Sequence, residues 1–95
     1  MTAYVVAEVD VIDAAGYEEY RRDVPATIAA YGGRFLVRGG ANEAFEGAPL
    51  KGRLVVLEFP TMERLRAWYR SAEYAPLIET RKRCTNTRLV AVEGV

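Results

Sequence analysis

The chain has 95 residues, 51% of them hydrophobic, which is enough for one small domain spanning residues 1–95 with a filled core. Thirteen basic residues balance thirteen acidic ones, so no net charge attracts nucleic acid or an anionic membrane. Histidine is absent, and the single cysteine excludes an internal disulfide, which is typical of a reducing cytoplasm. Since no long apolar run or signal peptide is present either, we expect a cytoplasmic protein.

The first third of the chain predicts a strand followed by a long helix. Apolar residues alternate from Ala3 to Val11 as in a strand that is covered on both sides. Asp13 is a suitable N-cap for the helix that follows. Its apolar stripe recurs every three or four residues, at Tyr17, Tyr20, Val24, Ile28 and Tyr31. Pro25 removes a backbone donor inside this helix, and we expect a kink or a break near Asp23.

The stretch Gly32-Gly33-Arg34-Phe35-Leu36-Val37-Arg38-Gly39-Gly40 organises the rest of the chain. It predicts a short strand, Arg34 to Arg38, with a glycine pair at each end. The first pair can end the preceding helix, because glycine enters left-handed backbone conformations without penalty. The second pair ends the strand and allows a backbone or a ligand to come close.

The second half predicts a loop, a strand, two helical segments and a last strand. Residues 41–52 form the loop, and Arg53 to Phe59 form an apolar strand that Pro60 closes. Thr61 caps the next helix, and Ser71 is expected to cap a further one that contains Pro76 near its start. Arg88 to Val92 form the last strand.

This order of elements predicts an α+β, ferredoxin-like βαββαβ domain with a four-stranded antiparallel sheet and helices on one face. Apolar residues leave neither face of the sheet polar, and a large exposed apolar face is unusual in a monomer. We therefore expect a homodimer in which the sheet faces of two copies pack together into a dimeric α/β barrel.

These stretches resemble the domain of unknown function 1330 family over almost the whole chain. The matching segments are Tyr17-Glu18-Glu19-Tyr20, Tyr31 to Gly40, Leu57-Glu58-Phe59-Pro60 and Trp68-Tyr69-Arg70-Ser71-Ala72-Glu73-Tyr74. The resemblance implies the dimeric α/β-barrel fold and brings no established activity. Enzymes and binding modules share that architecture, so the fold alone does not choose between them.

Arg38 is the strongest candidate for contacting an anion, because its planar fork of donors suits a carboxylate or a phosphate. The alternative is a structural role, in which Arg38 pairs with Glu8 or Glu58 on a neighbouring strand. The register across the long loop is not evident from the sequence, so both interpretations stay open. Because the register is open, Glu58 is also kept as a candidate ligand-binding residue.

Aromatic residues of the helices are expected to line the space between helices and sheet. Tyr20, Trp68 and Tyr69 are the ligand-binding candidates: Trp68 as a wall and the two phenols as orienting groups or proton donors. Aromatic residues at helical spacing are more often plain core, and this alternative also stays open.

Other site chemistries find little support. We expect no metal and no cofactor, because the carboxylates are scattered and the glycines do not match the dinucleotide-binding spacing. Cys84 follows basic residues but has no partner base. Residues 51–58 lack the stacking aromatics of an RNA-recognition strand, so nucleic acid is not an expected partner.

The leading hypothesis is a dimer that binds a small anionic or aromatic molecule, with a cofactor-free oxygenation or isomerisation as its reaction. The alternative is a non-catalytic structural or ligand-sensing module.

Overall fold

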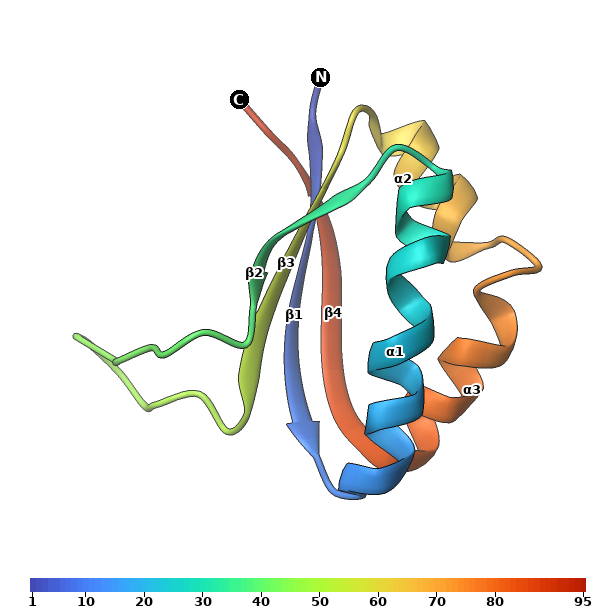
Figure 1. The fold of residues 1–95 in the computed structure, drawn as a ribbon. Coiled ribbons are helices and arrows are strands. Elements are labelled where there is room, and N and C mark those ends of the chain that lie inside the picture. The colour runs from blue at the N-terminus through green and yellow to red at the C-terminus, as the bar shows by residue number, and fades with distance from the viewer.

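The computed structural model describes residues 1–95, which form four strands and three helices (Figure 1). The elements in chain order are β1 (Ala3–Val11), α1 (Ala14–Ala30), β2 (Arg34–Arg38), β3 (Arg53–Phe59), α2 (Met62–Tyr69), α3 (Ala75–Cys84) and β4 (Thr85–Glu93). All strand pairs are antiparallel and the sheet order is β2-β3-β1-β4. The predicted ferredoxin-like α+β fold is confirmed.

The three helices cover one face of the sheet and leave the other bare (Figure 1). Alternate residues of β1, from Ala3 to Val9, are at most 4% exposed and form the inner face beneath the helices. Leu57 and Phe59 of β3 join them, and the helices add Val24, Ile28, Leu65 and Trp68 to the same core. Burial of this apolar surface is the main force that holds the helices to the sheet.

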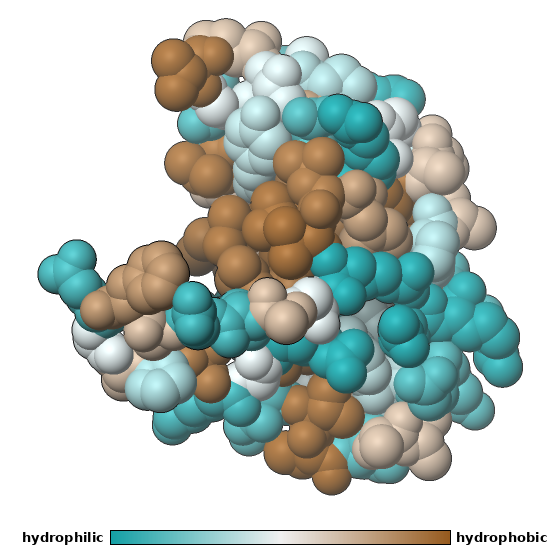
Figure 2. Space-filling model, turned by 60° about the vertical axis from the view of Figure 1, so that its left-hand side comes forward, coloured by the Kyte–Doolittle hydropathy of each residue, from teal (hydrophilic) through white to brown (hydrophobic).

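The opposite, outer face of the sheet is also largely apolar. The strand registers place on it Tyr4, Val6, Val37, Leu54, Val56, Val90 and Val92. Val90 and Val92 are 53% and 48% exposed. Two cross-strand ion pairs lie on the same face: Arg34 with Glu58 at 2.8 Å and Arg88 with Glu8 at 3.6 Å. Figure 2 looks toward this side and shows apolar atoms gathered across the middle of the molecule. The expectation of a sheet with two apolar faces is thus met.

The sequence predicted a kink or a break near Asp23, and the break is wrong, because helix α1 runs without interruption through Pro25. Proline lacks the N–H that would bond to the main-chain oxygen of Arg21, four residues earlier. That oxygen accepts a hydrogen bond from the side chain of Arg38 instead, at 2.6 Å. The helix continues because its freed carbonyl has found a donor on a neighbouring strand.

The first glycine pair ends α1 as predicted. Gly32 has a φ of +80°, and the N–H groups of Gly32 and Gly33 bond to the carbonyls of Ala29 and Ile28. A Cβ atom on Gly33 would lie 2.5 Å from the ring of Phe59, so only glycine lets the chain pass so close to the core. This turn fixes where β2 begins.

Two boundaries in the C-terminal half differ from the prediction. Helix α3 begins at Ala75 and not directly after Ser71. Ser71 instead closes a turn before the helix, because its Oγ accepts from the N–H of Tyr74 at 3.1 Å. Strand β4 starts at Thr85, before the predicted Arg88, because its polar first residues still pair with Asp10 and Val11 of β1. Backbone pairing extends the strand beyond its apolar pattern.

The loop at residues 39–52 projects from the sheet on the side away from the helices (Figure 1). It contains no regular secondary structure, and Phe45 on it is 88% exposed. None of the helices combines the length and the apolar character that crossing a membrane requires.

Candidate functional site

A cavity lies between the inner face of the sheet and the helices. Seventeen residues line it, 13 of them hydrophobic. The space open to the centre of a water-sized sphere measures about 40 Å³, and the whole hollow including its open mouth measures about 490 Å³. The cavity as it stands therefore has room for a few water molecules.

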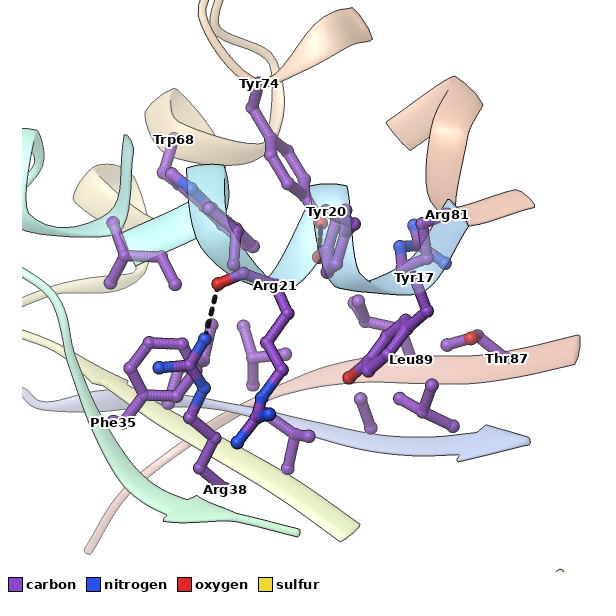
Figure 3. A pocket seen from close by; sticks show the side chains of 17 residues that line it. Tyr17, Tyr20, Arg21, Phe35, Arg38, Trp68, Tyr74, Arg81, Thr87 and Leu89 are labelled. Carbon is purple, nitrogen blue, oxygen red and sulfur yellow. Dashed lines mark hydrogen bonds between the residues drawn. The ribbon is translucent and has the colours of Figure 1, made fainter. Parts of the chain in front are cut away.

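A β-bulge in β2 turns Arg38 into this cavity. Arg34 and Phe35 lie opposite Glu58 and Leu57 of β3, but the register then shifts, and Arg38 lies opposite Val55. Phe35 and Arg38 therefore share the inner face. The guanidinium of Arg38 lies over the Phe35 ring, 4.4 Å from its centroid (Figure 3).

Arg38 has no carboxylate partner. Glu8 and Glu58 lie on the outer face, where they pair with Arg88 and Arg34. The predicted structural alternative, a pairing of Arg38 with Glu8 or Glu58, is therefore not what the structure shows. Arg38 instead bonds the main-chain oxygen of Arg21 through Nη2, which leaves its positive charge uncompensated by an acid.

Arg81 of α3 is a second arginine on the cavity wall, and sequence analysis gave it no role. The residue is only 5% exposed, forms no ion pair, and its Nε has no hydrogen-bond partner. A buried charge without a counter-ion costs several kcal/mol. Such a group is a candidate for function because a ligand can supply the missing counter-charge.

Tyr20 of α1 and Tyr74, just before α3, meet beside Arg81 (Figure 3). Their hydroxyl oxygens are 2.7 Å apart and form a hydrogen bond. Burial raises the pKa of Tyr20 far above its ordinary value of 10.0, and the neighbouring Tyr74 raises that pKa further. Burial raises the pKa of Tyr74 as well, although the bond with Tyr20 and the charge of Arg81 offset part of the rise. Both groups are therefore neutral phenols at physiological pH.

Trp68 supplies an aromatic wall. Its indole N–H donates to Thr27 Oγ1 at 3.0 Å, so the ring offers the cavity an apolar surface and no free donor. Its ring stacks on Tyr74 with centroids 4.2 Å apart, and Tyr17 stacks on Tyr20 at 5.9 Å. These contacts hold Tyr20 and Tyr74 in place from both sides.

The structure brings together three of the five residues that the sequence proposed. Arg38, Tyr20 and Trp68 line the cavity. Tyr69 packs edge-on against Trp68 and Tyr74 but does not line it. Glu58 lies on the outer face and is bound to Arg34.

All charged side chains that line the cavity are positive. Three arginines line the cavity, namely Arg21, Arg38 and Arg81, and no aspartate or glutamate does. Arg21 is exposed and lies 3.7 Å from Glu18. The cavity is thus an apolar space with positive charge on the strand side and on the α3 side, and it suits a molecule that is partly apolar and partly anionic.

Cys84 is 2% exposed and packs with Val9 and Tyr17 on the inner face. Burial raises the pKa of its thiol, with a further contribution from Asp13. The basic residues before it do not activate the thiol. No three histidine, cysteine, aspartate or glutamate side chains come together as a metal would require.

Comparison with solved structures supports the fold. A protein of unknown function from Rhodopseudomonas palustris has a TM-score of 0.80 at 18% identity, over 99% of this chain and 82% of that one. A dimeric ferredoxin-like protein of unknown function from Jannaschia sp. CCS1 has a TM-score of 0.73 at 16% identity, over 99% of this chain and 100% of that one. SnoaB, a cofactor-independent oxygenase from Streptomyces nogalater, has a TM-score of 0.65 at 12% identity, over 99% of this chain and 93% of that one.

No curated protein matches the sequence significantly. The profile of the family described as "domain of unknown function (DUF1330)" matches residues 2–95. The match includes the strand with glycine pairs at both ends and the Trp68 to Tyr74 segment on which the resemblance rested. The chain therefore belongs to the DUF1330 family.

Proposed function

We propose that this protein binds a small, partly apolar anion in the cavity between its helices and sheet. The observation that carries the proposal is the composition of the wall: three arginines, no acidic residue and an otherwise mostly hydrophobic surface. An anion would compensate the charge of Arg81 and would accept from the donors of Arg38 that the Arg21 carbonyl does not use. The apolar part of the ligand would lie against Trp68 and Phe35.

Binding requires the cavity to widen at its mouth, because the cavity now has room for only a few waters. Arg21 and Arg38 lie at this mouth and are both exposed. Long arginine side chains change rotamer quickly, so widening needs no movement of the sheet. We expect a ligand with a planar ring and one anionic group, because aromatic rings and arginines line the cavity.

The functional unit that we propose is a homodimer joined through the outer faces of two sheets. Half-exposed apolar side chains on this face, such as Val90 and Val92, would leave water on association. The dimeric ferredoxin-like neighbour supports the formation of a dimer. A stable interface needs about 800 Å² from each partner. The ion pairs Arg34–Glu58 and Arg88–Glu8 also lie on this face.

A cofactor-free oxygenation or isomerisation of the bound molecule is a second candidate function. The fold shared with a cofactor-independent oxygenase favours it, although that similarity concerns architecture. The hydrogen-bonded phenols of Tyr20 and Tyr74 supply a proton donor next to a positive charge, which such a step would use.

The proposal is tested by titrating the protein with benzoate while following tryptophan fluorescence. Trp68 is the only tryptophan and lines the cavity, so it reports binding there. We expect saturable quenching with benzoate and at least about tenfold weaker binding of benzyl alcohol, which has the same ring without the charge. Arg38→Met and Arg81→Met should each weaken benzoate binding, whereas Arg88→Met on the outer face should not. Equal binding of the two compounds, or no binding of any anion in a wider panel, would refute the proposal.

A further inference from the structure

We propose that Tyr20, Tyr74 and Arg81 form an oxyanion-binding centre that takes the deprotonated hydroxyl of a phenol or conjugated enol. The inference rests on the proposed function and deepens it, because it names the chemical class of the anion held beside α3. The three side chains come from α1, from the turn before α3 and from α3 itself, and all of them line the cavity. Figure 3 shows them together on the helical side of the hollow.

The hydroxyls of Tyr20 and Tyr74 carry two protons, and only one of these protons takes part in a hydrogen bond within the protein. Each hydroxyl carries one proton and can also accept hydrogen bonds. The bond between Tyr20 and Tyr74, 2.7 Å long, consumes one of the two protons. Neither hydroxyl donates to any other group of the protein. One O–H of the pair is therefore available to a third oxygen, which a ligand in the cavity would provide.

Arg81 supplies charge and a further donor at the same place. Its Nε–H is buried without an acceptor, in a residue that is 95% buried. No carboxylate lies within ion-pair distance of its guanidinium, so an anion placed here has no competitor in the chain. An O–H donor and a buried positive charge both favour a negative oxygen over a neutral hydroxyl.

The geometry suits a single oxygen better than a carboxylate. A carboxylate offers two oxygens and is best matched by the parallel donors of one guanidinium fork. Here the free O–H and the Nε–H belong to separate residues, and the guanidinium of Arg81 lies within hydrogen-bond reach of the Tyr74 hydroxyl. Trp68 stacks on Tyr74 and Tyr17 stacks on Tyr20, and the two pairs meet where the Tyr20 and Tyr74 rings are tilted by 54°. Aromatic surface beside the centre favours a planar conjugated body for the ligand.

The charged and titratable groups that face the centre are all basic or phenolic. They are Tyr17, Tyr20 and Arg21 of α1, Arg38 of β2, Tyr69 of α2, Tyr74 before α3 and Arg81 of α3. Arg53 of β3 lies opposite Val9 on the same face of the sheet, and its guanidinium lies over the Tyr17 ring, 5.2 Å from the centroid. Because no acid is present, the ligand's proton goes to solvent on binding, and the hydroxyl of the ligand is the group that titrates.

The test uses para-nitrophenol, whose phenolate is yellow. Absorbance is followed against pH with the protein in excess, and the apparent pKa of the bound compound is compared with that of the free compound. We expect the phenolate to bind about tenfold more tightly than the phenol, which lowers the apparent pKa by about one unit. Arg81→Met should abolish this shift, and Tyr20→Phe and Tyr74→Phe should each reduce it. Arg83→Met, the same substitution at an exposed site of α3, should leave it unchanged.

Circular dichroism of each variant establishes whether it is folded. If Arg81→Met does not fold, Tyr20→Phe, which removes a single oxygen atom, takes its place as the test of the pKa shift. Binding with an unchanged pKa would overturn this inference and leave the proposed function standing. Benzoate binding without para-nitrophenol binding would do the same. Failure of both compounds to bind would overturn the inference together with the proposed function.

Discussion

Arg38 donates a hydrogen bond through Nη2 to the main-chain oxygen of Arg21, the carbonyl whose helical donor is missing because residue 25 is proline. The contact ties the end of β2 to the middle of α1 across the mouth of the cavity (Figure 3). It explains how α1 passes Pro25 without a break. It also holds the guanidinium at the cavity with its other donors unused.

This relationship predicts an interaction between positions 25 and 38. Arg38→Met should lower the free energy of unfolding by about 1 kcal/mol, because the Arg21 carbonyl loses its donor. In a Pro25→Ala background the helix supplies an N–H to that carbonyl. Arg38→Met should then leave the free energy of unfolding nearly unchanged. Urea unfolding of the four proteins in this double-mutant cycle measures the difference. An equal cost of Arg38→Met in both backgrounds would show that the contact does not replace the missing helical donor.

Arg81→Met should leave the ligand-free protein at least as stable as the wild type. Methionine fills much of the same space without a buried charge, and replacing a buried charge by an apolar group is often neutral or stabilising. Thermal unfolding with and without benzoate checks this, since the wild type should gain more stability from the ligand than the variant does. A large loss of stability without ligand would assign Arg81 a structural role.

Stability should fall above about pH 10, and Tyr20 should be one cause. Burial raises the pKa of Tyr20 in the folded protein, whereas the unfolded chain titrates near the ordinary value of 10.0. The unfolded state therefore loses this proton first, and the stability that is fully present below pH 10 is lost as the pH rises. Tyr20→Phe should reduce the slope of unfolding free energy against pH by up to about 1.4 kcal/mol per unit. Identical slopes for Tyr20→Phe and wild type would contradict the assigned shift.

Placing a charge on the outer face of the sheet should separate the proposed dimer. Val90→Asp puts a carboxylate among the apolar residues that two copies would bury, where it would have no partner. Sedimentation velocity at micromolar concentration should show a dimer for the wild type and a monomer for this variant. Ala15→Asp, at an exposed position of α1, is the matched control and should remain dimeric. A wild-type protein that sediments as a monomer would remove the sheet-on-sheet arrangement.

The order of elements and the bounds of the first three strands follow from the sequence. Alternation of apolar residues marks β1 and β3, and glycine pairs mark the ends of β2. These patterns are local in the sequence, so they can be recognised without knowing which distant residues come into contact. The break at Pro25 was wrong because the donor that rescues the helix belongs to Arg38, a residue distant in the chain.

The site was harder to predict because it depends on register and burial. Simple alternation from Phe35 places Arg38 on the outer face, and only the bulge brings it to the inner one. Arg81 stands first in a run of basic residues, Arg81-Lys82-Arg83, which is typical of a solvated helix end. Its spacing from Leu77 and Ile78 does place it on their stripe, and this was the available signal. The pairing of Tyr20 with Tyr74 joins residues 54 positions apart, and no local pattern indicates it.

Binding of an anion in the cavity between Arg38 and Arg81 can be observed at the arginines themselves. Two-dimensional NMR follows the Nε–Hε signals of the arginine side chains during a benzoate titration. We expect the signals of Arg38 and Arg81 to shift together and saturate, while those of Arg34 and Arg88 on the outer face stay in place. Unchanged Arg38 and Arg81 signals, or shifts confined to the outer-face arginines, would contradict anion binding in the cavity.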